Sequence, residues 1–314
     1  MAQRKIIAVV GATGAQGGGL VRAILADPAG GFAARAITRD VSSPKARELA
    51  ALGAEVFAAD VDDPESVARA FAGAYGAFCV TFYWAHFKPE KEYAQARNMA
   101  NAAKAAGVSH VIWSTLEDVR TIVPWDSMPT LHGNYKVPHF DAKGESDHLF
   151  RDLGLPTTYF YPSYYWDNLI YFGAGPTKGP DGVLQFTLPT GSSKMAGVAA
   201  EDIGRIAYGI FKAGSRYVGQ KVGAAGEHLT GAEMAAKLGR ALGREVRHNA
   251  MSPEAYRGLG FPGADDLGNM FQFYRDYDGM LNAVRDVARS RELDPQLLTF
   301  DAWLAKHKDR IPIG

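Results

Sequence analysis

Apolar and polar residues alternate along the first half of the chain in a pattern typical of strands that alternate with helices. Short runs rich in β-branched and aromatic residues are separated by longer segments with helical apolar periodicity, which predicts helices on both faces of a parallel sheet. The predicted strands are residues 6–10, 34–38, 55–59, 77–83, 110–114 and 157–161. The predicted helices between them are residues 17–26, 64–71, 90–106 and 140–153. With right-handed crossovers, this order predicts an α/β fold with a doubly wound parallel sheet of the Rossmann type.

The pattern changes after Pro162. Gly- and Pro-rich segments at residues 173–182 precede helical runs at residues 200–212, 231–242 and 252–259. We therefore expect a dinucleotide-binding domain over residues 1–162 and a smaller C-terminal α+β domain over residues 163–314. The β-rich segment 220–223 is a candidate to return to the main sheet.

A glycine motif follows the first predicted strand directly. Residues 11–17 are Gly-Ala-Thr-Gly-Ala-Gln-Gly, and a helix with an apolar face comes next. Glycines at this spacing let the chain turn tightly, approach a pyrophosphate and pack helix against strand, while the amides at the helix start bind the diphosphate. A tight strand-to-helix turn without a ligand is the alternative, but the position between strand and helix favours dinucleotide binding.

The end of the second strand predicts which dinucleotide binds. Arg39 stands where an acidic residue would hold the ribose hydroxyls of NAD(H), and a guanidinium can grip a 2′-phosphate in a bidentate fork. This favours NADP(H), and a surface ion pair of Arg39 with Asp40 is the alternative. Asp60 and Val61, after the third strand, either flank the adenine or form an ordinary loop before a helix.

The segment from His139 to Glu145 is similar to the catalytic helix of short-chain dehydrogenases. In those enzymes a Tyr and a Lys lie four residues apart, near a Ser or Thr at the end of the fifth strand. Here Lys143 is present, Ser114-Thr115 ends the fifth strand, and His139 replaces the Tyr. We expect Lys143 to contact the cofactor. His139 is the second catalytic candidate, although Lys143 one turn away favours a neutral imidazole, which is a poor proton source. An ordinary amphipathic helix with Lys143 facing solvent is the alternative.

Two aromatic clusters follow predicted strands, at residues 82–84 (Phe-Tyr-Trp) and 164–166 (Tyr-Tyr-Trp). Because ligands bind at the carboxyl ends of strands in doubly wound sheets, these side chains could line a nicotinamide and substrate pocket. Packing within the protein interior is the commoner role of such residues.

Composition narrows the possible partners. The 314 residues are 47% hydrophobic, and 34 basic residues balance 34 acidic ones, so no net charge favours direct binding of nucleic acid. The single cysteine, Cys79, excludes an intrachain disulfide and favours a cytoplasmic location. The eight histidines show no metal-binding spacing, so we expect no metal site, and the uncharged segment 70–87 contains glycines and polar residues that argue against a membrane span.

These motifs together resemble the NmrA-like family, an atypical branch of the short-chain dehydrogenase superfamily, and within it the HSCARG-like NADPH sensors. The resemblance covers nearly the whole chain and includes the block from Gly260 to Phe271 (Gly-Phe-Pro-Gly-Ala-Asp-Asp-Leu-Gly-Asn-Met-Phe). It implies bound NADP(H) and a role in sensing the cellular redox state or in regulating a protein partner. An NADPH-dependent reductase of a quinone, aldehyde or imine is the alternative, with a small-molecule substrate as its partner. Whether the chain forms a homodimer stays open.

The motifs and the resemblance together define the candidate site. Lys143 and His139 are the catalytic candidates. The candidate cofactor-binding residues are Gly11, Thr13, Gly14, Ala15, Gln16, Gly17, Arg39, Asp60, Val61, Thr81, Phe82, Tyr83, Lys143, Ser163, Tyr164 and Tyr165.

Overall fold

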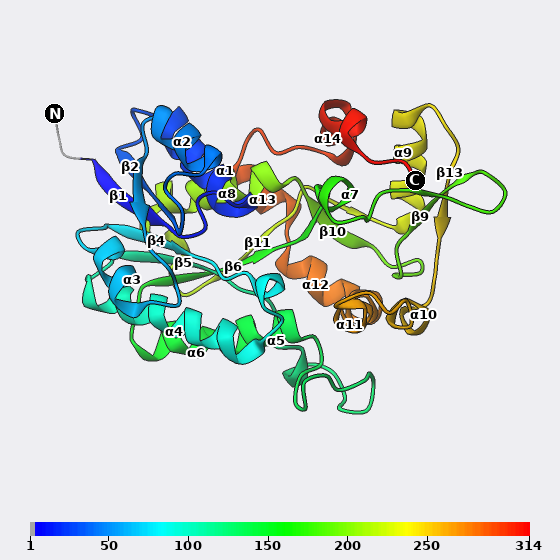
Figure 1. Cartoon of the computed structure of the whole chain (residues 1–314), viewed down its shortest axis with the longest axis horizontal. Coiled ribbons are helices and arrows are strands. Elements are labelled where there is room, and N and C mark those ends of the chain that lie inside the picture. The colour runs from blue at the N-terminus through cyan, green and yellow to red at the C-terminus, as the bar shows by residue number, and fades with distance from the viewer. Residues whose placement is uncertain (1–3) are drawn as a thin grey trace. The chain divides into compact units, whose positions relative to one another are not determined.

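The computed structural model describes residues 4–314 (Figure 1). The chain divides into two compact units, and each is built from three segments. The first unit comprises the chain up to Asp118, His139–Tyr161 and Glu201–Val222; the second comprises Val119–Pro138, Pro162–Ala200 and Gly223–Gly314. Both units draw on both halves of the sequence, and the domain boundary at residue 162 stays a prediction.

The main sheet has seven strands in the order β11-β6-β5-β4-β1-β2-β3. The pairs from β3 through β1 and β4 to β6 are parallel, which confirms the doubly wound fold predicted from the sequence. Strand β11 shows that the segment near residue 221 does return to this sheet. The strands are β1 (Lys5–Val9), β2 (Phe32–Thr38), β3 (Glu55–Ala58), β4 (Gly76–Cys79), β5 (His110–Ser114), β6 (Thr157–Pro162) and β11 (Lys221–Ala224).

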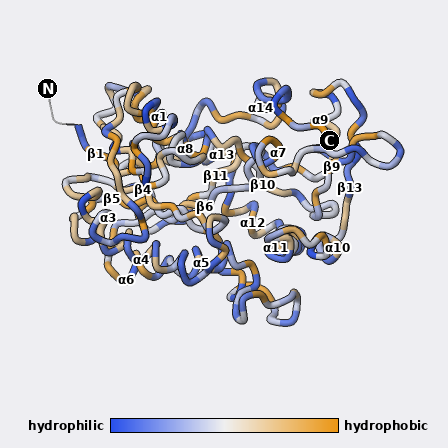
Figure 2. Tube along the Cα trace, viewed as in Figure 1, coloured by the Kyte–Doolittle hydropathy of each residue, from blue (hydrophilic) through white to orange (hydrophobic). Residues whose placement is uncertain are grey.

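Helices cover both faces of the sheet. On one face, Val67, Met99 and Phe150, from three different helices, pack in one apolar cluster with strand residues. On the other face, α1 and α8 approach so closely at Gly19 and Gly204 that a side chain on Gly204 would collide with the backbone of α1. Figure 2 shows the polar residues gathered on outlying helices such as α3 and α4. The helices are α1 (Ala15–Ala26), α2 (Pro44–Ala51), α3 (Pro64–Phe71), α4 (Pro89–Ala105), α5 (Pro138–Glu145), α6 (Asp147–Asp152) and α8 (Ala200–Lys212).

Three local predictions differ from the structure. Strand β4 ends at Cys79 rather than at residue 83, because Thr81 turns its hydroxyl to a buried carboxylate and Tyr83–Ala85 forms a 3-10 turn, η1. The single helix predicted over residues 140–153 is two helices. They separate at Ser146, whose hydroxyl donates to the carbonyl of Ala142 at 2.7 Å, a contact that bends helices. Helix α2 was not predicted, although Ser43 caps it and Pro44 begins it.

The second unit has the α+β character predicted for the C-terminal part. One small sheet has the order β12-β10-β7 and the other β13-β9-β8. The strands are β7 (Tyr164–Tyr165), β8 (Thr177–Lys178), β9 (Leu184–Thr187), β10 (Met195–Val198), β12 (Glu227–Leu229) and β13 (Val246–Asn249). The helices are α7 (Asn168–Tyr171), α9 (Gly231–Leu242), α10 (Pro253–Arg257), α11 (Ala264–Asp276), α12 (Asp278–Val284), α13 (Val287–Leu293) and α14 (Phe300–His307).

The sequence block near residue 260 has a structural role inside the second unit. In α11, the side-chain amide of Asn269 donates to the carbonyl of Pro129 at 2.9 Å, and that of Gln272 donates to the carbonyl of Ser127 at 2.7 Å. Arg257 bonds to both side chains. These bonds hold the segment Val119–Pro138 within the second unit.

Across residues 4–314, no helix combines the length and the apolar character needed to cross a membrane.

Candidate active site

The candidate residues of the first unit gather at one edge of the main sheet. From β1 the chain continues to β2 on one side, whereas β4 lies on the other side of β1, so the strand order reverses between β1 and β4. Ligands of doubly wound sheets bind outside the carboxyl ends of the strands at this point. The glycine segment follows β1, Arg39 follows β2, and Thr81 follows β4.

The backbone of the glycine segment leaves no room for a side chain at its third glycine. A Cβ on Gly17 would lie 2.5 Å from the carbonyl oxygen of Gly11. Gly11 has φ +66°, and its carbonyl accepts the amide of Gly14 at 2.9 Å. Only glycine fits position 17, so α1 packs closely against the end of β1, as the third glycine of a dinucleotide-binding motif requires.

The start of α1 is suited to an anion. Gly14 precedes the helix in an extended conformation, and among the described residues no side chain caps this helix start and no acidic residue stands in its first turn. Gly14 and Ala15 are exposed and Thr13 is partly exposed. Helix N-terminal amides bind phosphate groups. The residues present therefore fit the diphosphate of a dinucleotide.

Gln16 joins the glycine segment to the fifth strand. The hydroxyl of Ser114, the last residue of β5, donates to Oε1 of Gln16 at 2.8 Å. The Ser114 hydroxyl, which the sequence placed near the reaction centre, is thus held against the predicted cofactor loop.

Arg39 is exposed at the end of β2. In the described part of the chain no ion pair joins it to Asp40, the alternative considered from the sequence. The Asp40 carboxylate instead accepts the amide and hydroxyl of Ser42, at 2.8 and 2.6 Å, and these bonds lower the pKa of Asp40. The guanidinium of Arg39 therefore stands at the strand end where a 2′-phosphate would be held.

Asp60 and Val61 take part in the loop that follows β3. Oδ1 of Asp60 accepts the amide of Asp62 at 3.0 Å, and the carbonyl of Val61 accepts the side-chain amide of Asn98 at 2.9 Å. These bonds are those of an ordinary loop before a helix. Contact of Asp60 or Val61 with an adenine stays a prediction.

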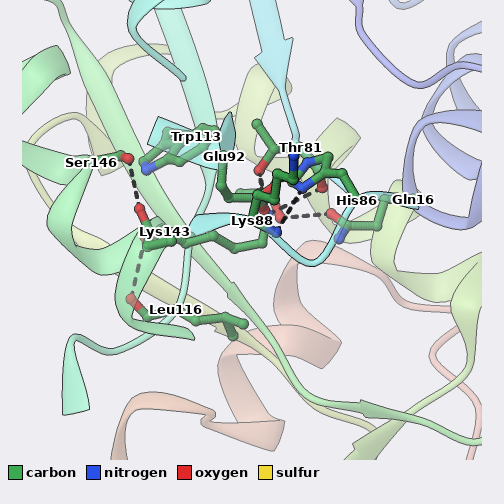
Figure 3. Close-up of polar contacts among 12 residues, drawn as sticks. Gln16, Thr81, His86, Lys88, Glu92, Trp113, Leu116, Lys143 and Ser146 are labelled. Atoms are coloured by element: carbon green, nitrogen blue, oxygen red, sulfur yellow. Dashed lines mark hydrogen bonds and ion pairs between the residues drawn. The ribbon is translucent and has the colours of Figure 1, made fainter. Parts of the chain in front are cut away.

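Lys143 does not face solvent, contrary to the alternative drawn from the sequence. Its Nζ lies 2.8 Å from Oε1 of Glu92 in α4, and it also donates to the hydroxyl of Thr81 (Figure 3). The Glu92 side chain is fully buried and the Lys143 side chain is 11% exposed. The Thr81 hydroxyl in turn donates to Glu92 at 2.6 Å. The three side chains form one closed polar group at the carboxyl end of β4.

The charge of Glu92 is stabilised by its neighbours. Burial alone raises the pKa of a carboxyl group, but the charge of Lys143 and the polar contacts with His86, Lys143 and Thr81 outweigh it and hold the pKa of Glu92 at about 2. Glu92 is therefore a carboxylate at neutral pH. The sequence prediction treats Lys143 as an unpaired cation one turn from His139. In the structure Lys143 is paired with the Glu92 carboxylate.

His139 lies among aromatic rings. In the first turn of α5, its ring centroid is 4.7 Å from that of Trp84, 4.7 Å from that of Phe140 and 6.1 Å from that of Tyr83. His139 is 7% exposed and Tyr83 is 2% exposed, whereas Phe82 is 57% exposed. Tyr83 and Trp84 thus pack around His139, Trp84 is partly exposed, and Phe82 is the most exposed of the three.

The last three candidates belong to the second unit. The Ser163 hydroxyl donates to the carbonyl of Ala224 at 2.5 Å, and Tyr164 and Tyr165 form β7, which pairs with β10. Their contact with a cofactor stays a prediction.

Sequence reasoning missed Glu92 and Asp147. Glu92 lies in the first turn of α4, where an acidic residue is ordinarily explained by the helix dipole and exposure to solvent. Asp147, at the start of α6, accepts hydrogen bonds from Trp113 and Thr115. Neither the residue type nor the spacing of these two residues signals burial, so no sequence feature could have identified them.

Metal chemistry receives no support from the described residues. Residues 4–314 contain no group of three or more His, Cys, Asp or Glu side chains placed to hold a metal ion. Cys79 is buried, and burial raises the pKa of its thiol far above the usual range. It is therefore an inert core residue.

Comparisons with known proteins agree with this geometry. A family model described as the NmrA-like family matches residues 3–304. The chain is 30% identical over 294 residues to the NmrA-like family domain-containing oxidoreductase FrzB of Cladobotryum sp, covering 87% of this chain and 85% of that protein. It is 32% identical over 263 residues to an NAD(P)H azoreductase of Xenophilus azovorans, covering 82% of each.

Solved structures show the same fold. The structure of NmrA, a negative transcriptional regulator, in complex with NADP superposes with a TM-score of 0.79 at 25% identity, covering 96% of this chain and 94% of that one. The triphenylmethane reductase of Citrobacter sp., complexed with NADP(H), has a TM-score of 0.73 at 20% identity, covering 96% and 99%.

Proposed function

The chain belongs to the NmrA-like family, and on this premise we propose that it is an oxidoreductase that uses NADP(H) in preference to NAD(H) to reduce a small electron-poor molecule. The observation that carries the proposal is the placement of the buried Lys143, bonded to Thr81 after the carboxyl end of β4, at the strand-order reversal between β1 and β4. Relatives described as an oxidoreductase and as an NAD(P)H azoreductase support the reaction class.

Each part of this edge has a distinct task in the proposal. The amides at the start of α1 hold the diphosphate, and Arg39 pairs with the 2′-phosphate. Lys143 donates a hydrogen bond to a ribose hydroxyl and so orients the nicotinamide. When bound, the dinucleotide supplies a hydride from its nicotinamide ring.

The packing of His139 narrows the substrate class. A phenol poised as an acid would protonate the product as the hydride arrives, but here the corresponding position holds an imidazole enclosed by aromatic rings. Substrates that accept a hydride first and take their proton from water suit such a site. Quinones, whose hydride adduct is a stabilised phenolate, and imines already protonated to iminium ions are of this kind, so we propose them ahead of simple aldehydes.

Binding and turnover test the proposal directly. Calorimetric titration of the full chain with NADPH and NADH should give a clearly tighter complex with NADPH. Nicotinamide absorbance should then fall faster when a quinone or an imine is added than when a simple aldehyde or no substrate is added. Failure to bind either dinucleotide, or loss of absorbance at the same rate with and without every substrate, would contradict it.

A second candidate is a regulator that senses NADP(H), which the resemblance implied. The replacement of the usual Tyr by a packed His139 favours it, as does the fold shared with a negative transcriptional regulator. A sensor responds only if the ligand binds two conformations with different affinity. Small-angle scattering and protease sensitivity should then change with NADPH while no substrate is turned over; unchanged profiles would rule the sensor out.

A further inference from the structure

Glu92 is the buried partner of Lys143, and it lies behind Lys143 with no proposed contact of its own to the nucleotide. We propose that Glu92 is a positioning residue: together with Thr81 it orients the Lys143 ammonium so that one N–H is presented to the nucleotide. The inference rests on the proposed binding of a dinucleotide at this edge of the sheet.

The three hydrogens of the ammonium have defined acceptors. One faces Oε1 of Glu92 at 2.8 Å, and one faces the Thr81 hydroxyl. The third meets the carbonyl oxygen of Thr81 at 3.1 Å. Because the Thr81 hydroxyl donates its own hydrogen to Glu92, it can only accept from Lys143. Glu92 therefore orients the ammonium both directly and through Thr81.

The three contacts differ in strength. Contacts between two charged groups are the strongest, and the contact with Glu92 is an ion pair. The contact with the Thr81 carbonyl is the longest, and its acceptor is neutral. It is the one that a ribose hydroxyl can replace while the other two persist. The ammonium then turns a single, directed N–H to the ligand.

Glu92 is itself held from its other side. The amide of Lys88 donates to Nδ1 of His86 at 3.1 Å, so the imidazole hydrogen is on Nε2. That atom faces Oε2 of Glu92 at 3.5 Å. The carboxylate lies between His86 and Lys143, as Figure 3 shows.

Two substitutions separate the charge of Glu92 from the length of its side chain. Glu92→Gln keeps the length of the side chain and removes the charge, and it should weaken NADPH binding about tenfold, the effect of losing one charged hydrogen bond. Glu92→Asp keeps the charge but withdraws the carboxylate by one methylene, and it should weaken binding severalfold. The matched control is Glu55→Gln, which removes a carboxylate paired with Arg35 at the opposite end of the strands and should leave the affinity unchanged.

A double-variant cycle distinguishes positioning from general stability. If Glu92 acts through Lys143, then Glu92→Gln should cause no further loss of NADPH affinity in a Lys143→Met background. A purely structural role would lower the affinity by the same factor in both backgrounds. If Glu92→Gln fails to fold, Glu92→Asp and Glu92→Asp/Lys143→Met replace it in the same cycle, since Glu92→Asp retains the charge.

The outcomes are separable. The inference is overturned if both Glu92 variants bind NADPH as tightly as the original protein. It is also overturned if Glu92→Gln lowers the NADPH affinity by the same factor with and without Lys143→Met. In both cases the proposed function stands. If the original protein binds neither NADPH nor NADH, the proposed function fails and the inference fails with it.

Discussion

The indole nitrogen of Trp113, in β5, donates a hydrogen bond of 2.9 Å to Oδ1 of Asp147 at the start of α6. The same oxygen accepts the Thr115 hydroxyl at 2.6 Å, and the Tyr161 hydroxyl donates to Oδ2 at 3.3 Å. Burial nevertheless raises the pKa of Asp147 to about 6, because these neutral donors compensate only part of the lost hydration. One half-buried carboxyl group thus joins β5, β6 and α6 and has a raised pKa.

Asp147 should make the protein less stable as the pH rises from about 4 to 6. The folded protein holds the Asp147 proton more tightly than the unfolded chain. The proton's contribution to the free energy of unfolding is therefore complete below the unfolded pKa of 3.8 and is lost as the pH rises through the folded pKa of about 6. A pKa difference of this size corresponds to about 3 kcal/mol in the free energy of unfolding. Asp147→Asn should remove this loss, measured as urea unfolding free energies across that interval. An unchanged pH slope in the variant would contradict the assignment.

His110 should have the opposite effect. Burial lowers the pKa of this imidazole to about 4, so the unfolded chain takes up a proton first and the protein loses stability as the pH falls from about 6.5 to 4. Nε2 of His110 lies 2.9 Å from the Thr158 hydroxyl, a bond that a glutamine amide can replace. Urea unfolding of His110→Gln should show less acid destabilisation than the original protein. A steeper loss in acid would refute this explanation.

The third glycine of the motif should tolerate no side chain. In Gly17→Ala the Cβ would lie 2.5 Å from the carbonyl oxygen of Gly11, so the loop must open and nucleotide binding should fall at least tenfold. Gly279→Ala is the control, because a Cβ there meets nothing within 4 Å and alanine favours the helix. Calorimetry with NADPH should therefore separate the two variants, and equal affinities would argue against a phosphate cradle at residues 11–17.

Arg39 should discriminate between the two dinucleotides. Arg39→Gln removes the guanidinium from the end of β2 and should weaken NADPH binding by about tenfold or more while leaving NADH binding nearly unchanged. Arg69→Gln removes an exposed guanidinium from α3 and serves as the control. Calorimetric titrations with NADPH and NADH measure the ratio of the two dissociation constants in each variant. Equal losses for NADPH and NADH would show that Arg39 does not recognise the 2′-phosphate.

Removal of Lys143 should destabilise the protein for reasons unrelated to catalysis. Lys143→Met leaves the fully buried carboxylate of Glu92 without its counter-charge, which typically costs about 3–5 kcal/mol. The double variant Lys143→Met/Glu92→Gln contains neither charge and should recover much of this loss. Thermal unfolding of the three proteins measures it. If the double variant is no more stable than Lys143→Met, the pair contributes nothing to the fold.

The fold was largely predictable because its signals are local. Strands β1, β2, β5 and β6 and helices α3, α8 and α9 follow from apolar periodicity and from capping residues within a few positions. Two of the errors lie where a side-chain contact decides the local conformation. Strand β4 stops early because Thr81 bonds to Glu92, and the helix after Pro138 breaks at Ser146, beside an Asp147 that is bonded to β5.

The sequence by itself determined the glycine turn and the basic residue after the second strand, since steric fit and strand-end position depend on neighbouring residues alone. It also placed Lys143 on a helix one turn after His139. Only the tertiary structure decided that Lys143 is paired with a buried carboxylate of another helix and that His139 is enclosed by aromatic rings. Burial is a property of the assembled core, where residues distant in the chain exclude water together, and the charge of a side chain depends on that environment.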